Sequence, residues 1–533
     1  MTKVLFLLFC RSRHHEPRHI ERSPDTARPG VAWFAKVADG PLLFTEQIFP
    51  RPASPDAAAQ VNEVIDELAK LLGQAGGDLR RVVRLHFYIA DDAVTLVRSA
   101  LARDTDQAVV RWKAGAAAVD ITPEGPVWMA GYGARKKPSE GVAQKLYAKA
   151  LTLDDGAGGR LAIVTLDLIS VPRTLREAVE RRAREQHGLR PEEILLNASH
   201  THSGPSPAAR GVSDPALAAK AEDYGRLLSE KIVQAITQAL GRSGTAAVHY
   251  TWARAGFAMN RRLRVGTEIR NSPNPDGPVD HDVPVVRVTG DDGKEKAILF
   301  GYACHNTVTG FYVINGDYAG YAQSYIEEKR PGVTALFPMG AGGDKNPYPR
   351  HASLEQAEQH GRILANAVET ALSVTVQRPL TGPLRSALRT VDLDYADIAP
   401  AELEQRAQSR QADEKRRAEQ YLEQLKQGTL PKSYPCPVQV VQFGTGLTLV
   451  AIGGETTVEY ALRLKRELAG DAAIWVAGYS NDVFGYLGSR RVIVEGGYEG
   501  YSANLGRHPG PWATSTEDRI ISMVYELSRS INH

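Results

Sequence analysis

Two histidines one residue apart, His200 and His202, stand in the segment NASHTHSGP at residues 197–205. The segment follows the apolar run 194–196, which is typical of a buried strand. A backbone that turns at a strand end can aim both imidazoles near one point, and a neutral imidazole is a common ligand of Zn²⁺. Taken alone, a His-x-His pair is weak support for a metal site, because surface and hydrogen-bonded histidines are also common.

Five further segments stand out in the sequence. Three contain side chains that can bind a metal, one contains an arginine, and one opens the region. His305 lies in GYACHNTV (301–308), Glu455 in GGETTVEYALRLKREL (453–468) and Tyr486 in GYSNDVFGY (478–486). Arg261 lies in AMNRR (258–262), and an opening segment with GAAAVDITP and MAGYG spans 115–133. In their order along the chain, these segments and the one at 197–205 resemble those of the neutral/alkaline ceramidase family, over residues 110–515.

The resemblance implies a zinc centre with His200, His305, Glu455 and Tyr486 as ligands, so Zn²⁺ is the expected cofactor. Two neutral imidazoles and one carboxylate make a catalytic site with three protein ligands that leaves room for water. A tyrosine is an unusual fourth ligand, because a phenolic oxygen binds weakly unless the metal helps to remove its proton.

The same resemblance places His202 and Arg261 at the substrate. His202 corresponds to the family's second histidine, which faces the substrate oxygen, and Arg261 to its oxyanion-stabilising arginine. Both side chains are donors that can stabilise charge developing on a carbonyl oxygen. The implied reaction is hydrolysis of an N-acyl amide, in a ceramide-like lipid or a related small acyl substrate, by zinc-activated water.

One segment departs from the family pattern. The family carries Gly-Asp-x-Ser-Pro with a serine proposed as nucleophile, whereas this chain has GAGGDKNPYPR at 340–350. Aligning Gly343, Asp344 and Pro347 puts Asn346 in the serine's place. Asparagine has no hydroxyl to activate, so covalent catalysis at this position is excluded, while zinc-activated water does not need it. Asn346 and Asp344 stay candidate catalytic residues in a positioning role.

Two alternatives remain open. A zinc esterase or deacylase on a soluble substrate would use the same residues on a different acyl compound. A catalytically idle, metal-containing binding protein is the reading that Asn346 favours. Hydrolysis of short- and long-chain N-acyl amines, with and without a chelator, distinguishes them.

Strands and helices alternate along most of the chain, which indicates an α/β protein. Strands are predicted over 161–169 and 193–198, with a helix over 173–187 that ends at Gly188. The polar segment 401–427 predicts one solvated amphipathic helix. We expect one large hydrolase domain at 111–533, with mixed β-sheets covered by helices.

Residues 1–110 predict a separate small α/β module. Strands over 31–37 and 42–49, a helix over 56–72 and a strand over 82–89 follow one another. This β-β-α-β stretch resembles the first half of the Rid (reactive intermediate deaminase) family, without the half that supplies the ligand-binding arginine. The resemblance therefore implies a role in assembly, such as a homo-oligomer contact, and not deamination.

Composition narrows the function classes. Lys+Arg 64 against Asp+Glu 62 leaves no broad basic field, which argues against nucleic-acid binding. No apolar run approaches the ~18–20 residues of a transmembrane helix. Three distant cysteines, Cys10, Cys304 and Cys436, predict neither a disulfide framework nor a cysteine metal site. The short apolar start at 4–10 lacks a cleavage site, so a soluble protein is expected, export is only weakly supported and the compartment stays open.

Overall fold

The computed structural model describes residues 20–24, 32–37 and 112–531, apart from 208–211, 213, 352, 375–376, 411, 471 and 506. Contacts between Cα atoms divide the chain into two units, residues 1–109 and 110–533. In the first unit, strands β1 (Ile20–Pro24) and β2 (Ala32–Val37) pair antiparallel. β2 falls on the predicted strand 31–37. The predicted strands at 42–49 and 82–89 and the predicted helix at 56–72 lie outside the described residues.

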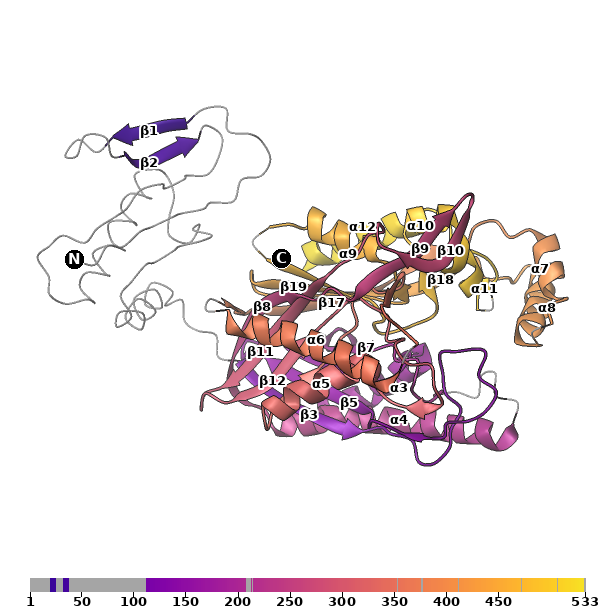
Figure 1. Ribbon diagram of the computed structural model, residues 1–533, viewed down its shortest axis with the longest axis horizontal. Coiled ribbons are helices and arrows are strands. Elements are labelled where there is room, and N and C mark those ends of the chain that lie inside the picture. The colour runs from indigo at the N-terminus through magenta and orange to yellow at the C-terminus, as the bar shows by residue number, and fades with distance from the viewer. Residues whose placement is uncertain are drawn as a thin grey trace, which may run out of the picture. The chain divides into compact units, whose positions relative to one another are not determined.

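The second unit has four layers, in the order helices, sheet, sheet, helices (Figure 1). A nine-stranded mixed sheet has the order β14-β12-β11-β8-β3-β5-β6-β7, with β16 paired to β8. Its strands are β3 (Trp112–Asp120), β5 (Tyr147–Asp154), β6 (Arg160–Leu166), β7 (Ile194–Ala198), β8 (Gly244–Arg254), β11 (Asp282–Gly290), β12 (Glu295–Phe300), β14 (Thr334–Leu336) and β16 (Arg378–Pro379).

A four-stranded sheet of order β17-β18-β19-β21 forms the other inner layer. Its strands are β17 (Leu384–Asp394), β18 (Ser433–Phe443), β19 (Leu447–Ile452) and β21 (Ala473–Ala477). Successive side chains of a strand point to opposite faces, so a strand buried on both faces is apolar throughout. In β19, Leu449 joins the core between the two sheets, while Val450 joins the core under the outer helices.

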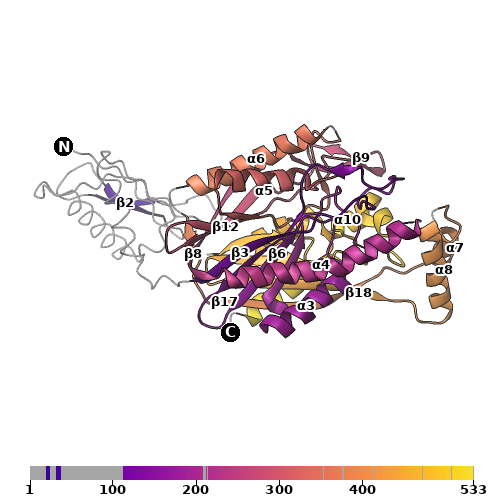
Figure 2. The ribbon, with the colours of Figure 1, turned by 90° about the horizontal axis from the view of Figure 1, so that it is seen from below.

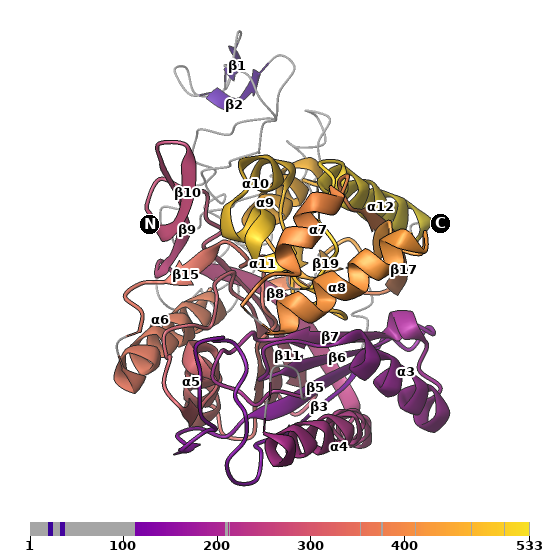
Figure 3. The same ribbon diagram turned by 90° about the vertical axis from the view of Figure 1, so that its right-hand side faces the viewer.

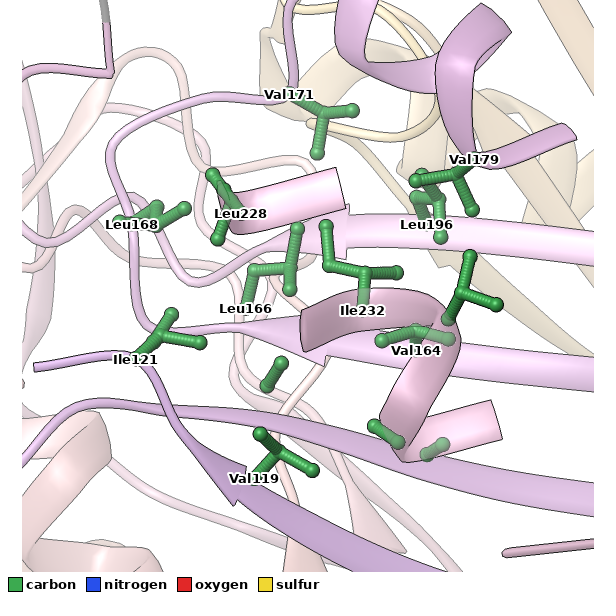
Figure 4. Close-up of a cluster of buried hydrophobic side chains, with 14 of the residues drawn as sticks. Val119, Ile121, Val164, Leu166, Leu168, Val171, Val179, Leu196, Leu228 and Ile232 are labelled. Carbon is green, nitrogen blue, oxygen red and sulfur yellow. The ribbon is translucent and has the colours of Figure 1, made fainter. Parts of the chain in front are cut away.

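Helices cover the two outer faces. The helices α3 (Arg173–His187), α4 (Pro215–Gly241), α5 (Asp317–Lys329) and α6 (Leu354–Ser373) lie on the nine-stranded sheet, and α9 (Val458–Glu467) and α12 (Thr516–Ser530) lie on the four-stranded sheet (Figure 3). The long helix α4 runs across β3, β5 and β6 (Figure 2). Its Leu228 and Ile232 pack on Val164, Leu166 and Leu196 of the strands (Figure 4).

Shorter elements complete the unit, and several of them carry residues of the candidate site. They are β4 (Gly141–Val142) with β13 (Val313–Ile314), the three-stranded sheet of β9 (Ala258–Val265), β10 (Glu268–Asn274) and β15 (Lys345–Pro347), the pair β20 (Glu455–Thr456) and β22 (Tyr486–Leu487), η3 (Pro191–Glu193), α10 (Arg490–Glu495), the π-helical turn η4 (Tyr498–Ser502) and α11 (Ala503–Leu505).

The α/β class and the mixed sheets covered by helices are confirmed. Helix α3 has the predicted bounds and ends at Gly188, whose φ of +61° closes the last turn in the left-handed conformation. The single helix predicted over 401–427 is wrong, because the chain forms α7 (Pro400–Arg406) and α8 (Ala412–Lys426). Arg406 at the end of α7 donates to the carbonyls of His508 and Pro509, which holds α7 against that segment instead of letting it continue.

The structure also bears on the expectations about cysteines and membrane-spanning helices. Cys304 and Cys436 are both buried free thiols. Among the helices that the structure describes, none combines the length and the apolar character needed to cross a bilayer.

Candidate functional site

His200 leaves the nine-stranded sheet just beyond β7. The backbone N–H groups of Ser199 and His200 donate to the carbonyls of Leu166 and Leu168, at 2.9 Å each, which turns the chain across the end of β6. His200 has a φ of +64°, a left-handed conformation that side-chain-bearing residues rarely adopt. Tyr479, at φ +53°, packs its ring 4.5 Å from the His200 ring. Such strained positions persist only where the surrounding structure holds them, and they cluster at functional sites.

Backbone carbonyls set the tautomers of two imidazoles. His200 Nδ1 lies 2.7 Å from the carbonyl oxygen of Ile169, and His305 Nδ1 lies 2.8 Å from that of Gly342. A carbonyl oxygen only accepts, so each Nδ1 carries the proton and each Nε2 keeps a lone pair. The two Nε2 atoms lie 3.2 and 3.5 Å from Glu455 Oε2. This is the arrangement by which outer partners orient metal-binding histidines.

Glu455 and Tyr486 reach the same place from the pair β20–β22. The two strands are parallel and put Glu455 directly opposite Tyr486. The phenolic oxygen of Tyr486 lies 3.3 Å from His305 Nε2. The structure therefore brings together all four residues that sequence reasoning named as zinc ligands, from four segments of the chain.

The electrostatics of this group fit a bound cation. Burial raises the pKa of Glu455, but the neighbouring His200 and His305 act against burial and hold the pKa well below its usual range. Burial lowers the pKa of His305 to about 3, so this ring is neutral at physiological pH. Glu455 Oε2 accepts no hydrogen bond from the described residues. A buried carboxylate facing imidazole lone pairs needs a positive partner, and a metal ion would supply it.

His202 completes a cluster of three histidines. One ring nitrogen from each of His200, His202 and His305 lies within 4.8 Å of the others, so this cluster could hold a metal ion. His202 Nε2 lies 3.1 Å from His200 Nε2, and its buried Nδ1 has no hydrogen-bond partner in the described part of the chain. Burial, with the nearby His200 and His305, lowers the pKa of His202 well below its ordinary value. His202 is therefore a neutral ring at the edge of the cluster.

The MAGYG segment packs against His202, a function that its sequence did not indicate. Gly131 has a φ of +106°, and a Cβ atom there would lie 2.6 Å from the His202 ring. The ring of Tyr132 lies 5.0 Å from that of His202, and Arg135 Nη1 donates to the His202 carbonyl at 2.7 Å. The absence of a side chain at residue 131 thus leaves room for the imidazole.

Arg261 is 4% exposed and is largely committed to protein partners. Its Nη2 donates to the Tyr486 phenol at 2.9 Å and to the Gly343 carbonyl at 2.8 Å. Its Nη1 donates to Asn346 Oδ1 at 3.1 Å. Burial disfavours its charge, but Tyr486 and Glu499 outweigh burial and raise the pKa of Arg261 well above its usual value. A guanidinium has five N–H groups, so one on Nη1 has no partner among the described residues.

Asn346 and Asp344 differ in how many of their hydrogen-bonding groups already have partners. Asn346 lies in β15 and is fully buried, and its Nδ2 has no hydrogen-bond partner among the described residues. Asp344 accepts from Lys345 Nζ at 2.9 Å, from Asn260 Nδ2 at 3.0 Å and from the Val458 N–H at 3.0 Å. Asp344 therefore ties β9, β15 and the start of α9 together, while Asn346 keeps two donor hydrogens available.

Sequence reasoning missed Glu499, which supports this network. Its carboxylate is 1% exposed and accepts from Arg261 Nε and from Arg262 Nη1, at 2.7 Å each. Its neighbours in the sequence GGYEGY give no sign of this, since both arginines lie more than 230 residues away. A buried acidic residue between two arginines becomes visible only in three dimensions.

A family comparison covers the first part of this unit. Residues 112–359 match the family model described as neutral/alkaline non-lysosomal ceramidase, N-terminal. This region contains His200, His202, Arg261, His305 and Asn346, whereas Glu455 and Tyr486 follow it. The match begins at residue 112, so the Rid resemblance of the N-terminal segment gains no support from it.

Two curated relatives are distant ceramidases. The neutral ceramidase of Pseudomonas aeruginosa is 24% identical over 311 residues, which cover 54% of this chain and 46% of that protein. Neutral ceramidase A of Dictyostelium discoideum is 26% identical over 268 residues, covering 45% of this chain and 36% of that protein. The matched parts thus span less than half the length of each relative.

Solved structures agree on the fold. The crystal structure of neutral ceramidase from Pseudomonas aeruginosa superposes with a TM-score of 0.62 at 19% identity, covering 79% of this chain and 74% of that chain. A structure described as ceramidase complexed with C2 gives 0.61 at 19% identity. This chain therefore has a mixed α/β fold resembling that of neutral ceramidase.

Proposed function

We propose that this protein is a zinc-dependent amidohydrolase that cleaves the N-acyl amide bond of a ceramide-like lipid or a related acyl compound. The observation that carries the proposal is the meeting of His200 Nε2, His305 Nε2, Glu455 Oε2 and the Tyr486 phenol at one buried place. The ceramidase family domain at residues 112–359 supports the choice of amide hydrolysis.

The donor set suits zinc. Two imidazole nitrogens, a carboxylate and a phenolic oxygen are borderline and hard ligands of the kind that Zn²⁺ accepts. A zinc ion held there would activate water and polarise a carbonyl group. The carbonyls of Ile169 and Gly342 keep the histidine Nε2 atoms unprotonated for such an ion.

The remaining residues can bind the substrate carbonyl. In the Nε2–H tautomer, neutral His202 would donate a hydrogen bond at the edge of the cluster. Asn346 Nδ2 and the uncommitted Nη1 hydrogen of Arg261 lie in one network and would add two further donors. Donors fixed in a buried site stabilise a developing oxyanion without reorganising during the reaction. In this scheme Asp344 holds the scaffold and Glu455 or a neighbouring group handles the proton.

Asn346 favours a rival proposal, a metal protein that binds but does not react. A zinc esterase acting on a soluble acyl compound is the rival within the enzymes. Both rivals keep the same metal ligands, so metal content alone does not separate them from the amidohydrolase.

One experiment separates all three. Purified protein is assayed with N-acyl amines of short and long chain and with matched acyl esters, before and after chelation and after zinc is returned. We expect amide hydrolysis that disappears with the metal and returns with zinc, about one zinc per chain, and loss of both in His305→Ala. His187→Ala, a change at a histidine outside the cluster, is the matched control.

Each rival has its own outcome. Hydrolysis of esters alone would replace the amidohydrolase by the esterase. Full zinc occupancy without turnover of any substrate would leave the binding protein. Full zinc occupancy in His305→Ala would overturn the ligand assignment.

A further inference from the structure

Arg507 lies beside the metal-facing carboxylate without a close partner. Its Nη1 is 4.0 Å from Glu455 Oε1, whereas the histidine contacts of this carboxylate are made by Oε2. That separation exceeds a hydrogen bond, and no nearer acceptor for this guanidinium occurs in the described part of the chain. The side chain is 38% exposed, so it borders both the buried cluster and solvent.

The backbone around Arg507 is fixed to the Tyr486 strand. Asn504 accepts from the Tyr486 N–H at 2.9 Å and donates to the Tyr486 carbonyl at 3.0 Å. The Arg507 N–H donates to the Asn504 carbonyl at 2.8 Å. A Cβ atom placed at Gly485 would lie 3.7 Å from Arg507 Cδ, so the arginine stem packs over residues 485–486. These contacts place the Arg507 side chain beside the site.

Several other charged side chains around the site pair with one another. Glu499 is shared by Arg261 and Arg262, and Arg262 also meets Glu495 at 3.1 Å. Lys345 and Asp344 form a fully buried pair at 2.9 Å. Glu455 faces the histidines, where the proposed cation would neutralise it. Arg507 differs from them, because its ion-pair contact with Glu455 Oε1, at 4.0 Å, is too long for a hydrogen bond.

Tyr498 belongs to the same part of the site, since the charges of Glu455 and Arg507 both act on the pKa of its phenol. Tyr498 is 44% exposed, and its ring lies 5.4 Å from that of Tyr486. An arginine offers a fork of N–H donors for a planar anion, and the half-exposed tyrosine adds apolar surface to the same part of the site. A carboxylate is the anion whose geometry this fork matches in two parallel hydrogen bonds.

We propose that Arg507 binds a carboxylate near the scissile bond, and that the substrates of this site include N-acyl amino acids. The inference rests on the proposed amide hydrolysis and names its substrate class. In the reaction, water adds its oxygen to the acyl carbon, the C–N bond breaks and the amine nitrogen takes a proton. The products are a carboxylic acid and a free amino acid, with Arg507 holding the carboxylate of the amino-acid half.

A matched pair of substrates tests this inference. N-octanoylglycine and N-octanoylethanolamine share the acyl chain and the amide, and differ in a carboxylate against a neutral hydroxymethyl group. We expect wild-type protein to prefer the glycine compound by about 10- to 100-fold in kcat/KM, the range of one charge-assisted hydrogen-bonding contact. Arg507→Met should abolish the preference, mainly through KM, and Arg507→Lys should restore part of it.

The controls separate this inference from the proposed function. Arg226→Met, which removes an exposed arginine on α4, should keep the wild-type preference. Equal kcat/KM for the two compounds, unchanged in Arg507→Met, would contradict the carboxylate site. It would not contradict amide hydrolysis. If neither compound is hydrolysed, calorimetry with the same pair decides. Tighter binding of N-octanoylglycine that Arg507→Met removes keeps the site while the proposed function fails, and no binding overturns both.

Discussion

Glu455 and Tyr486 face each other as register partners in the two-residue parallel pair β20–β22. Their separation is therefore set by a backbone ladder and not by flexible side chains alone. Arg261 then fixes the phenolic oxygen through a 2.9 Å hydrogen bond, and Glu499 fixes Arg261. The Glu455 carboxylate, the Tyr486 phenol and the Arg261 guanidinium are thus positioned together, although they come from distant segments.

Arg261→Ala should lower kcat by about 10²–10³-fold, the usual effect of losing one oxyanion donor, while zinc stays bound. The measurement is the rate on the best amide substrate together with the metal content of the same sample. Arg264→Ala on the same strand is the control, since that side chain is 55% exposed. A rate equal to wild type would remove Arg261 from the mechanism and favour the idle binding protein.

Asn346→Ala should cost less than Arg261→Ala, roughly tenfold in rate, because it removes one neutral hydrogen-bonding group. Asn346→Ser should not be needed for activity, since wild type is expected to turn over already. Single-turnover kinetics of the three proteins on one substrate measure both effects. Activity that appears only in Asn346→Ser, with a burst of covalent intermediate, would show that the chemistry runs through a serine nucleophile.

Gly131→Ala should impair catalysis without removing the metal. The added Cβ would lie 2.6 Å from the His202 ring, and a φ of +106° is itself unfavourable for alanine. Gly133→Ala, two residues along the same segment, is the control because its Cβ would meet nothing within 4 Å. The measurement is kcat and zinc content for both variants. Equal activity of the two would mean that the position of His202 does not matter.

Glu499→Ala should destabilise the fold by about 3–5 kcal/mol, because it leaves two buried arginines without their shared carboxylate. Denaturant unfolding of the zinc-loaded protein measures the loss. Glu230→Ala removes an exposed partner of Arg182 and should leave the unfolding midpoint almost unchanged. If Glu499→Ala unfolds at the wild-type midpoint, the buried network contributes nothing to stability.

The sequence predicts best those features that are local. The helix at 173–187 carries its own apolar stripe and its own stop at Gly188, so its bounds follow from a short segment. The HTHSGP segment likewise shows its chemistry within a few residues. His200 and His305 could be identified as candidate ligands because each lies in a short segment that resembles one of the family's motifs.

The features that could not be predicted from the sequence depend on contacts between distant residues. The partners of Glu499 lie 237 and 238 residues away, and Arg507 gains meaning only from its 4.0 Å approach to Glu455. The commitment of Arg261 to Tyr486 was also invisible, since an arginine in AMNRR could as well face open solvent. The break between α7 and α8 depends on Arg406 meeting residues 508–509, a contact that the polar composition of 401–427 does not encode.

The order of the proposed zinc ligands along the chain has a consequence for assembly. His200 and His305 lie within the matched region 112–359, whereas Glu455 and Tyr486 come from the part that also builds the four-stranded sheet. During synthesis, half of the donor atoms would emerge well before the others. Tight metal capture should therefore be a late event that reports completion of both sheets. A ribosome-released fragment ending near residue 359 would hold zinc weakly, however well its own strands had formed.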